Sequence, residues 1–333
     1  MKLSDFKIGW RLLAKEPTYS SVVIFGLAIA FSACFLVLSV LLFSLSFDQH
    51  IPGVENVYIA KSHPNWFQNR AYWRENVPMP VKANLEQSGL PVTSTRVMEL
   101  ATNMQVISAQ SETQTALSQT VTLSLVDSAF PDIFGVQTVA GDLKLALTRP
   151  DALALSEETV QQLFHEKNSA AVLGRSLQIE GKSYQILAII RTPLETTSVP
   201  YAALAGINSS VWNQEKRQDF SGNWNSFEGR LYLKLAAGIA PEKVAQIIKA
   251  AVTTSPLRTQ LKPEEIVDLG KRDLLEVELG KLTDSYLDDS NTSSNRSRKF
   301  DVGMIVVLGI MASLILLLAM SNFINLTIAR TMT

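Results

Sequence analysis

Two long uncharged stretches interrupt an otherwise mixed sequence. Residues 20–47 and 302–329 each run for 28 positions without Asp, Glu, Lys or Arg. At about 1.5 Å of rise per residue each stretch would form a helix of roughly 42 Å, longer than the ~30 Å hydrocarbon layer of a bilayer. The first stretch is too long for a cleaved secretory signal, so we interpret it as a retained anchor. The pattern predicts transmembrane helices over residues 20–47 and 302–329.

Residues 48–301, between the stretches, alternate short β-rich and helical patterns. The helical patterns cover Pro80–Ser88, Ser156–Phe164 and Pro241–Ala251, with Ser156 as a helix N-cap. The β-rich runs are Val54–Ala60, Gln119–Leu125, Ala152–Leu155, Ser176–Ile190 and Arg230–Leu235, and Glu180-Gly181-Lys182 resembles the turn of a hairpin. The predicted fold class is a membrane protein in which two transmembrane α-helices flank a mixed α/β domain.

The remaining segments read as connections and as a surface helix. Residues 108–120 and 284–301 are polar and predict linkers. Residues 1–19 predict an amphipathic helix that ends near Pro17, with basic side chains beside an apolar face. Such a helix lies in the membrane interface. It either sets topology alone or docks a cytoplasmic partner, and composition does not choose between the two.

Charge gives an orientation and excludes nucleic acid as a partner. The chain carries 30 Lys and Arg against 31 Asp and Glu, a formal charge of -1, which does not suit a nucleic-acid binder. Residues 1–19 contain four basic and two acidic side chains, whereas no basic residue follows the first stretch until Lys61. The positive-inside bias therefore predicts a cytoplasmic N-terminus, residues 48–301 outside, and residues 330–333 back in the cytoplasm.

Patterns that carry enzymatic chemistry are missing from the sequence. It contains no Walker A loop, GxSxG elbow, HExxH or GxGxxG motif. The only cysteine, Cys34, lies within the first stretch, and His50, His63 and His165 have no Cys or His companion at metal-ligand spacing. We expect no catalytic, metal or cofactor site in this chain.

The second stretch becomes polar at its inner end. Asn322 and Asn325 are three residues apart and so share a helix face, followed by Arg330. Amides at this depth contact another helix or form a hydrated helix end, and both readings stay open.

Five loose motifs follow one another along nearly the whole chain. They are Trp10-Arg11-Leu12-Leu13 with Pro17, Gly26–Ala30, Ser46–Pro52 with Val57-Tyr58, Phe130–Gly135 with Gly141-Asp142, Ala154–Glu157 and Leu163-Phe164, and Ser321–Leu326 with Ala329-Arg330. With the order of the parts described above, these motifs resemble the N-terminal half of a MacB-like, FtsX-type permease of an ABC transporter.

The resemblance implies a mechanical function. Residues 48–301 would be a periplasmic core domain, with a porter-like part, Val54–Gln105 plus Arg230–Leu279, and an inserted second subdomain. A separate cytoplasmic ATPase would bind ATP and Mg²⁺, and the permease of the bacterial inner membrane would carry its closure to the periplasm for export or extrusion. A second permease copy or half and a periplasmic adaptor would be further partners. The docking helix would use Leu3, Phe6, Trp10 and Arg11, and coupling at the inner mouth would use Asn322, Asn325 and Arg330.

Two other classes share parts of this pattern. A two-span ligand receptor of the chemoreceptor or sensor-kinase type has the same topology, and so has a membrane-anchored assembly factor without an ATPase. The family continues beyond its second span, whereas this sequence stops at Thr333. We therefore expect it to be the first part of a longer permease. The cargo stays open.

Overall fold

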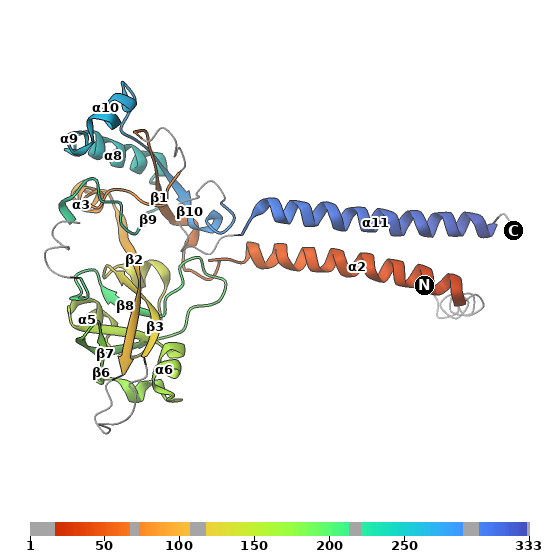
Figure 1. Ribbon diagram of the computed structural model, residues 1–333, viewed down its shortest axis with the longest axis horizontal. Coiled ribbons are helices and arrows are strands. Elements are labelled where there is room, and N and C mark those ends of the chain that lie inside the picture. The colour runs from red at the N-terminus through yellow and green to blue at the C-terminus, as the bar shows by residue number, and fades with distance from the viewer. Residues whose placement is uncertain (1–16, 67–72, 107–117, 213–220, 289–299, 332–333) are drawn as a thin grey trace. The chain divides into compact units, whose positions relative to one another are not determined.

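The structure, a computed structural model, describes residues 17–66, 73–106, 118–212, 221–288 and 300–331. It comprises two bodies (Figure 1). A helical pair belongs to Met1–Ser46 and Phe300–Thr333, and a core domain belongs to Phe47–Lys299. The predicted fold class, two apolar helices flanking a mixed α/β domain, is confirmed.

The helical pair consists of α2 (Pro17–Leu45) and α11 (Val302–Thr331). Both helices are long and apolar enough to cross a membrane. They pack through small side chains, with Ala30 and Ala312 buried and the Cys34 Sγ 4.0 Å from the carbonyl oxygen of Ala312. Small residues let helix backbones approach closely in lipid, where packing rather than water exclusion drives association. Large apolar side chains elsewhere on the pair are exposed, as expected for helices surrounded by lipid or by further helices.

The core domain is built on one ten-stranded sheet. Its order is β10-β1-β9-β2-β3-β8-β5-β7-β4, and β6 pairs with β2 and β7. Neighbours are antiparallel except for the parallel pairs β3 with β8 and β5 with β7. The strands are β1 (Val57–Pro64), β2 (Val92–Val106), β3 (Ser118–Val126), β4 (Thr138–Gly141), β5 (Ala152–Ser156), β6 (Ser176–Ile179), β7 (Lys182–Ile190), β8 (Ala203–Gly206), β9 (Arg230–Leu235) and β10 (Leu275–Lys281).

Helices cover the sheet in two groups. The α-helices are α3 (Val81–Gln87), α4 (Phe130–Phe134), α5 (Leu143–Thr148), α6 (Glu157–Phe164), α8 (Pro241–Thr253), α9 (Leu257–Gln260) and α10 (Pro263–Leu269), and the 3₁₀ turns are η1 (Val54–Asn56), η2 (Ser169–Val172) and η3 (Leu282–Asp284). The first lobe contains β10, β1, β9 and the start of β2, with α3, α8, α9 and α10. The second lobe contains the other strands with α4, α5 and α6.

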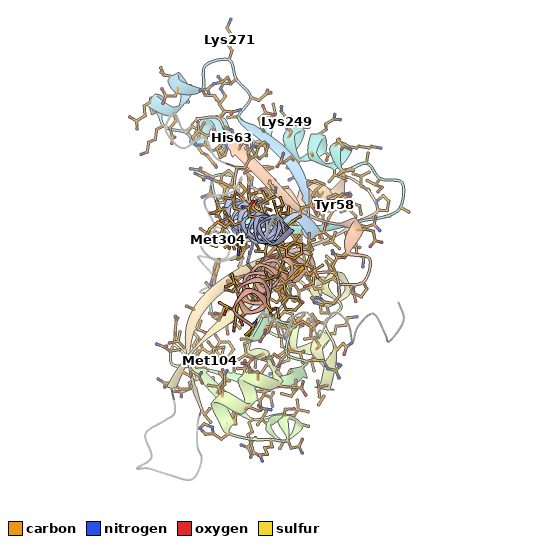
Figure 2. The ribbon with its side chains drawn as sticks, turned by 90° about the vertical axis from the view of Figure 1, so that its right-hand side faces the viewer. Tyr58, His63, Met104, Lys249, Lys271 and Met304 are labelled. Carbon is orange, nitrogen blue, oxygen red and sulfur yellow. The ribbon has the colours of Figure 1, made fainter. Side chains whose placement is uncertain are left out.

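Strand β2 belongs to both lobes. Its residues Val92–Val97 pair with β9, and Val97–Gln105 pair with β3. Figure 2 shows the consequence, since Met104 near the end of β2 lies in the second lobe, far from His63 and Lys249 in the first. The porter-like part implied by the resemblance, Val54–Gln105 plus Arg230–Leu279, contains nearly all of β2, whereas the strand pairs in both lobes, so the lobes do not coincide with that division.

A third apolar cluster, which we call the junction core, joins the lobes. It includes Val57 and Tyr232 from the first lobe, Phe130 and Phe134 from α4 in the second, and Val97 at the crossover of β2. Phe134 meets Tyr232 edge-on with ring centroids 5.1 Å apart. Because protein interiors are close-packed and barely compressible, this shared core resists movement of one lobe against the other.

Several local predictions are confirmed by the fold. The Ser156 hydroxyl accepts a hydrogen bond from the Thr159 amide at 3.2 Å and caps α6. The hairpin of β6 and β7 turns on Glu180 and Gly181, both with left-handed φ, so its turn is one residue shorter than predicted.

The linker predictions fail in part. Residues 118–120 belong to β3 rather than to a linker, because they pair with β2. At the other linker, Ser285 and Tyr286 are buried. The rest of both segments, residues 108–117 and 289–299, lies outside the described residues.

Candidate coupling site

The residues predicted to couple the chain to a partner lie in or beyond the helical pair. Asn322 and Asn325 are exposed on α11. Arg330 lies in the last turn of α11, and its side chain is outside the described part of the chain. The predicted docking residues are also outside it, namely Leu3, Phe6, Trp10 and Arg11. All of these roles stay predictions.

The chain enters and leaves the core domain at one place. We call Phe47–Ile51 the first connector and Leu282–Asp288 the second connector. The Phe47 ring stacks on the Tyr286 ring with centroids 3.4 Å apart and planes 13° from parallel, and both side chains are buried. Ile51 and Leu282 both contribute to the junction core. The two connectors are therefore joined to each other and to the body of the domain.

A buried lysine fixes the second connector to the sheet. Lys61 of β1 forms ion pairs with Asp288 and, at 3.6 Å, with Glu278 of β10. Its side chain crosses the sheet over Gly280, where an added Cβ would lie 2.4 Å from the Lys61 Cε. The missing side chain at Gly280 leaves the space that the lysine side chain occupies. A buried cation that lost these carboxylates would be left uncompensated, at a cost of about 3–5 kcal/mol.

Asp48 fixes the first connector in a different way. The residue is 0% exposed and has a left-handed φ of 60°. Its Oδ1 accepts hydrogen bonds from the Thr197 hydroxyl at 3.0 Å and the Ser198 amide at 2.9 Å. Its own amide donates to the Thr196 carbonyl at 2.9 Å. Burial raises the pKa of the Asp48 carboxyl, and the hydrogen bonds from Ser198 and Thr197 oppose that shift.

Charged side chains are buried where β2 passes from one lobe to the other. Arg230 of β9 pairs with Glu99 of β2, and both side chains are 9% exposed. Arg96 directly precedes Val97, the residue of β2 at which pairing passes from β9 to β3. Its guanidinium donates hydrogen bonds to four backbone carbonyls, and its backbone amide donates one to the Asp127 carboxylate. Burial lowers the pKa of Arg96 to about 10, and the charge of Asp127 opposes that shift. Arg96 therefore remains charged at neutral pH and holds the crossover in place.

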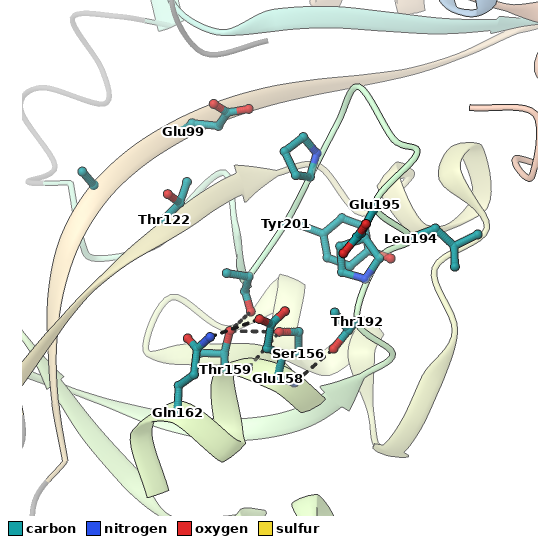
Figure 3. Close-up of a pocket in the computed structure, with 14 residues that line it drawn as sticks. Glu99, Thr122, Ser156, Glu158, Thr159, Gln162, Thr192, Leu194, Glu195 and Tyr201 are labelled. Atoms are coloured by element: carbon teal, nitrogen blue, oxygen red, sulfur yellow. Dashed lines mark hydrogen bonds between the residues drawn. The ribbon is translucent and has the colours of Figure 1, made fainter. Parts of the chain in front are cut away.

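A pocket of about 670 Å³ opens between strands β2 and β3 and the start of α6 (Figure 3). Its wall carries the carboxylates Glu99, Glu158 and Glu195, and the residues that line it include no Lys or Arg. The Glu158 carboxylate accepts a hydrogen bond at 3.1 Å from the side-chain amide of Gln162, which lines the same pocket. Among the described residues no group of His, Cys, Asp and Glu is arranged to hold a metal ion.

The comparisons with known proteins identify the domain. The family model of the MacB-like periplasmic core domain matches residues 20–251. The chain belongs to this family. Among solved structures, a domain of a protein described as a permease from Porphyromonas gingivalis is similar at 19% identity and a TM-score of 0.53, over 79% of this chain and 99% of that one. This likeness shows the fold. No curated protein matches.

Two further structures resemble the MacB-like core domain more distantly. The periplasmic region of MacB from Actinobacillus actinomycetemcomitans is 11% identical, with a TM-score of 0.45 over 71% of this chain and 94% of that one. The extracellular domain of the ABC-type transporter YknZ from Gram-positive bacteria is 10% identical, with a TM-score of 0.42 over 67% and 99% of the two chains. The family is a component of ABC transporter permeases, and with its two apolar helices the chain is a membrane protein.

Sequence reasoning did not find the residues that fix the connectors. Asp48 falls within the Ser46–Pro52 motif, but its role in the fold was not predicted, because its partners Thr197 and Ser198 lie 149 and 150 residues away. Tyr286 fell within a segment read as a linker. Its aromatic ring in that polar segment was the one available signal, since a large ring is usually buried.

Proposed function

We propose that this chain is the permease subunit of a MacB-like, FtsX-type ABC transporter. A separate cytoplasmic ATPase binds ATP and Mg²⁺, and the spans carry its closure to the core domain on the far side of the bacterial inner membrane. The chain itself hydrolyses nothing. Its work is to convert ATP-driven closure into a movement of the core domain that serves export or extrusion.

The observation that carries this proposal is the meeting of the two connectors. Phe47 and Tyr286 stack at the point where both connectors join the domain. Forces that arrive through either span therefore act on one site of a body whose lobes share a junction core. A core domain that both connectors hold at one site is suited to transmit a displacement, because packed cores do not deform continuously.

The cytoplasmic side supplies the predicted contacts with the ATPase. The amphipathic helix at residues 1–19 presents Leu3, Phe6, Trp10 and Arg11 to the partner, and Asn322, Asn325 and Arg330 act at the inner end of α11. In this arrangement a second permease copy or half completes the complex and a periplasmic adaptor contacts the core domain.

Reconstitution tests the partnership. The full chain is purified with any ABC ATPase that co-purifies, and the pair is placed in nanodiscs. We expect the chain to stimulate ATP hydrolysis, and the double variant Trp10→Ala with Arg11→Ala to weaken that stimulation. Asp5→Asn, away from the apolar face of the same predicted helix, is the control and should leave stimulation unchanged. A two-span receptor or an assembly factor would bring no ATPase with it, and that result would refute the proposal.

Labelling in cells tests the orientation. In a Cys34→Ala background, Leu194→Cys introduces a thiol at a core-domain position that is 56% exposed. A membrane-impermeant maleimide should label it in intact spheroplasts. Thr333→Cys, on the predicted cytoplasmic side, should react only after lysis. The reverse pattern would contradict the orientation.

A further inference from the structure

One wall of the core domain is a segment without regular structure, Arg191–Ala202, which we call the strap. Both of its ends are tied to the start of α6. The Thr192 hydroxyl accepts a hydrogen bond from the Glu158 amide at 3.0 Å, and the Ala202 carbonyl accepts one from the Thr159 hydroxyl at 3.0 Å. Figure 3 shows Thr192 beside Glu158 at this end of the pocket. The strap is thus a loop whose two ends are fixed to α6.

The middle of the strap is held by the first connector. Thr196, Thr197 and Ser198 make the three hydrogen bonds to Asp48 described above. The Val199 amide donates to the Thr197 hydroxyl at 3.2 Å, so the turn gripped by Asp48 is itself internally bonded. Asp48 is the second residue of the core domain, directly after Phe47.

The strap also separates two pockets. Its residues Thr192–Glu195 and Pro200–Ala202 line the pocket of about 670 Å³. Its other side lines a smaller pocket of about 270 Å³, whose opposite wall includes His50 and Ile51 of the first connector. The strap has no strand or helix of its own, and Leu194 is exposed, whereas Val199 packs in the junction core. A displacement of the strap would change the shape of both pockets.

A buried aspartate at position 48 lowers the stability of the fold, which indicates that its side chain does more than form a turn. Aspartate tolerates a left-handed backbone better than most residues, but its buried carboxylate carries a desolvation cost. Its Oδ2 has no hydrogen-bond partner among the described residues, so hydrogen bonds compensate only one of its two oxygens. Glycine would form the same turn without that cost but would lose the two side-chain hydrogen bonds to Thr197 and Ser198.

We propose that Asp48 couples the first connector to the strap, so that a displacement of the first span moves the strap and reshapes the larger pocket. This inference rests on the proposed function, which supplies the displacement. It makes Asp48 a positioning residue for that function and the strap the moving wall of the domain.

Hydrogen exchange of the full chain in nanodiscs tests the contact itself. Asp48→Ala removes the acceptor, and we expect the Ser198 amide to exchange about tenfold faster, because a hydrogen bond to a charged group is lost. Asp48→Asn keeps an acceptor oxygen and tolerates the left-handed backbone, so exchange should stay near that of the parent. Asp132→Ala, at an exposed position of α4, is the control. Equal exchange in Asp48→Ala and the parent would overturn the proposal.

A fluorescent reporter tests the coupling. An environment-sensitive dye is attached at Leu194→Cys in the Cys34→Ala background, and the chain is reconstituted with its ATPase. We expect ATP to change the dye emission in the parent and in Asp48→Asn but not in Asp48→Ala, which should still stimulate ATP hydrolysis. Stimulated hydrolysis with no ATP-dependent emission, or with emission that Asp48→Ala preserves, refutes the role of Asp48 alone. Absence of stimulation in the parent refutes the proposed function, and the inference with it.

Discussion

Replacing Arg96 by methionine should destabilise the core domain severely. The arginine is 2% exposed and its guanidinium donates to the carbonyl oxygens of Val77, Pro78, Met79 and Glu228 at distances from 2.9 to 3.4 Å. These carbonyls belong to the segments before α3 and before β9. Methionine fills a similar volume but donates nothing, so the carbonyls of Val77, Met79 and Glu228 lose this donor, whereas the Pro78 carbonyl keeps the Val81 amide at 3.1 Å.

The expected magnitude follows from two opposing effects. Each buried acceptor left without a donor costs about 1–3 kcal/mol. Removing the guanidinium also removes its desolvation cost, which is visible as the lowered pKa of Arg96 and returns part of that loss. Relaxation should let the weaker acceptors find other donors, and with three carbonyls left without this donor we expect a net loss of about 3–5 kcal/mol. This is a large part of the 5–15 kcal/mol typical of a folded domain.

Urea unfolding followed by tryptophan fluorescence measures this effect in the detergent-solubilised full chain. Of the five tryptophans, Trp66, Trp73, Trp212 and Trp224 lie between residues 47 and 299, so the signal reports mainly on the core domain. With a slope of about 3 kcal/mol per molar urea, the midpoint should fall by about 1–1.7 M.

The same substitution at an exposed site supplies the control for Arg96. Arg258→Met, at an exposed position of α9, should change stability by about 0.5 kcal/mol or less. If Arg96→Met lies within 1 kcal/mol of this control, the four carbonyls do not depend on the guanidinium, and the view that Arg96 holds the lobe crossover is wrong.

Three further changes test other parts of the fold. Gly229→Ala should lower the urea midpoint of unfolding more than Gly238→Ala does. Both glycines have a left-handed φ, but a Cβ at Gly229 would lie 2.5 Å from a β2 carbonyl oxygen, whereas Gly238 faces open space. Ser156→Ala should lower stability by about 1 kcal/mol, and hydrogen exchange at Thr159 should rise, because α6 loses its cap. Asp48→Asn should gain stability over the parent as pH rises above 4. The raised pKa of Asp48 means that the folded parent binds the proton more tightly than the unfolded chain, so its stability falls between the unfolded and folded pKa values.

Local signals in the sequence predicted local structure well. The Ser156 cap and the Glu180-Gly181 turn depend on residues within three or four positions of one another, and both were found. Strand β10, Leu275–Lys281, was missed although its apolar and charged residues alternate as in a half-buried strand. Its place at the edge of the sheet depends on pairing with β1, more than 200 residues earlier, which no local pattern contains.

The site was harder to predict than the fold for the same reason. Phe47 and Tyr286 become partners only after the whole domain has folded between them. From residue type alone, Arg96 and Lys61 would be expected on the surface, since arginine and lysine are seldom buried. Their burial follows from the carbonyls and carboxylates that distant segments bring to them.

The distribution of stiffness within the core domain supports the division of roles proposed for it. Buried charges at Arg96, Arg230 and Lys61 lie at the lobe crossover and at the second connector, where a change of geometry would strand them without partners. Deforming these places is therefore expensive, because it would expose an uncompensated charge to the interior. The strap contains no buried lysine or arginine, and Asp48 holds its middle. A force that arrives at the first connector should accordingly reach the wall of the larger pocket through the hydrogen bonds of Asp48.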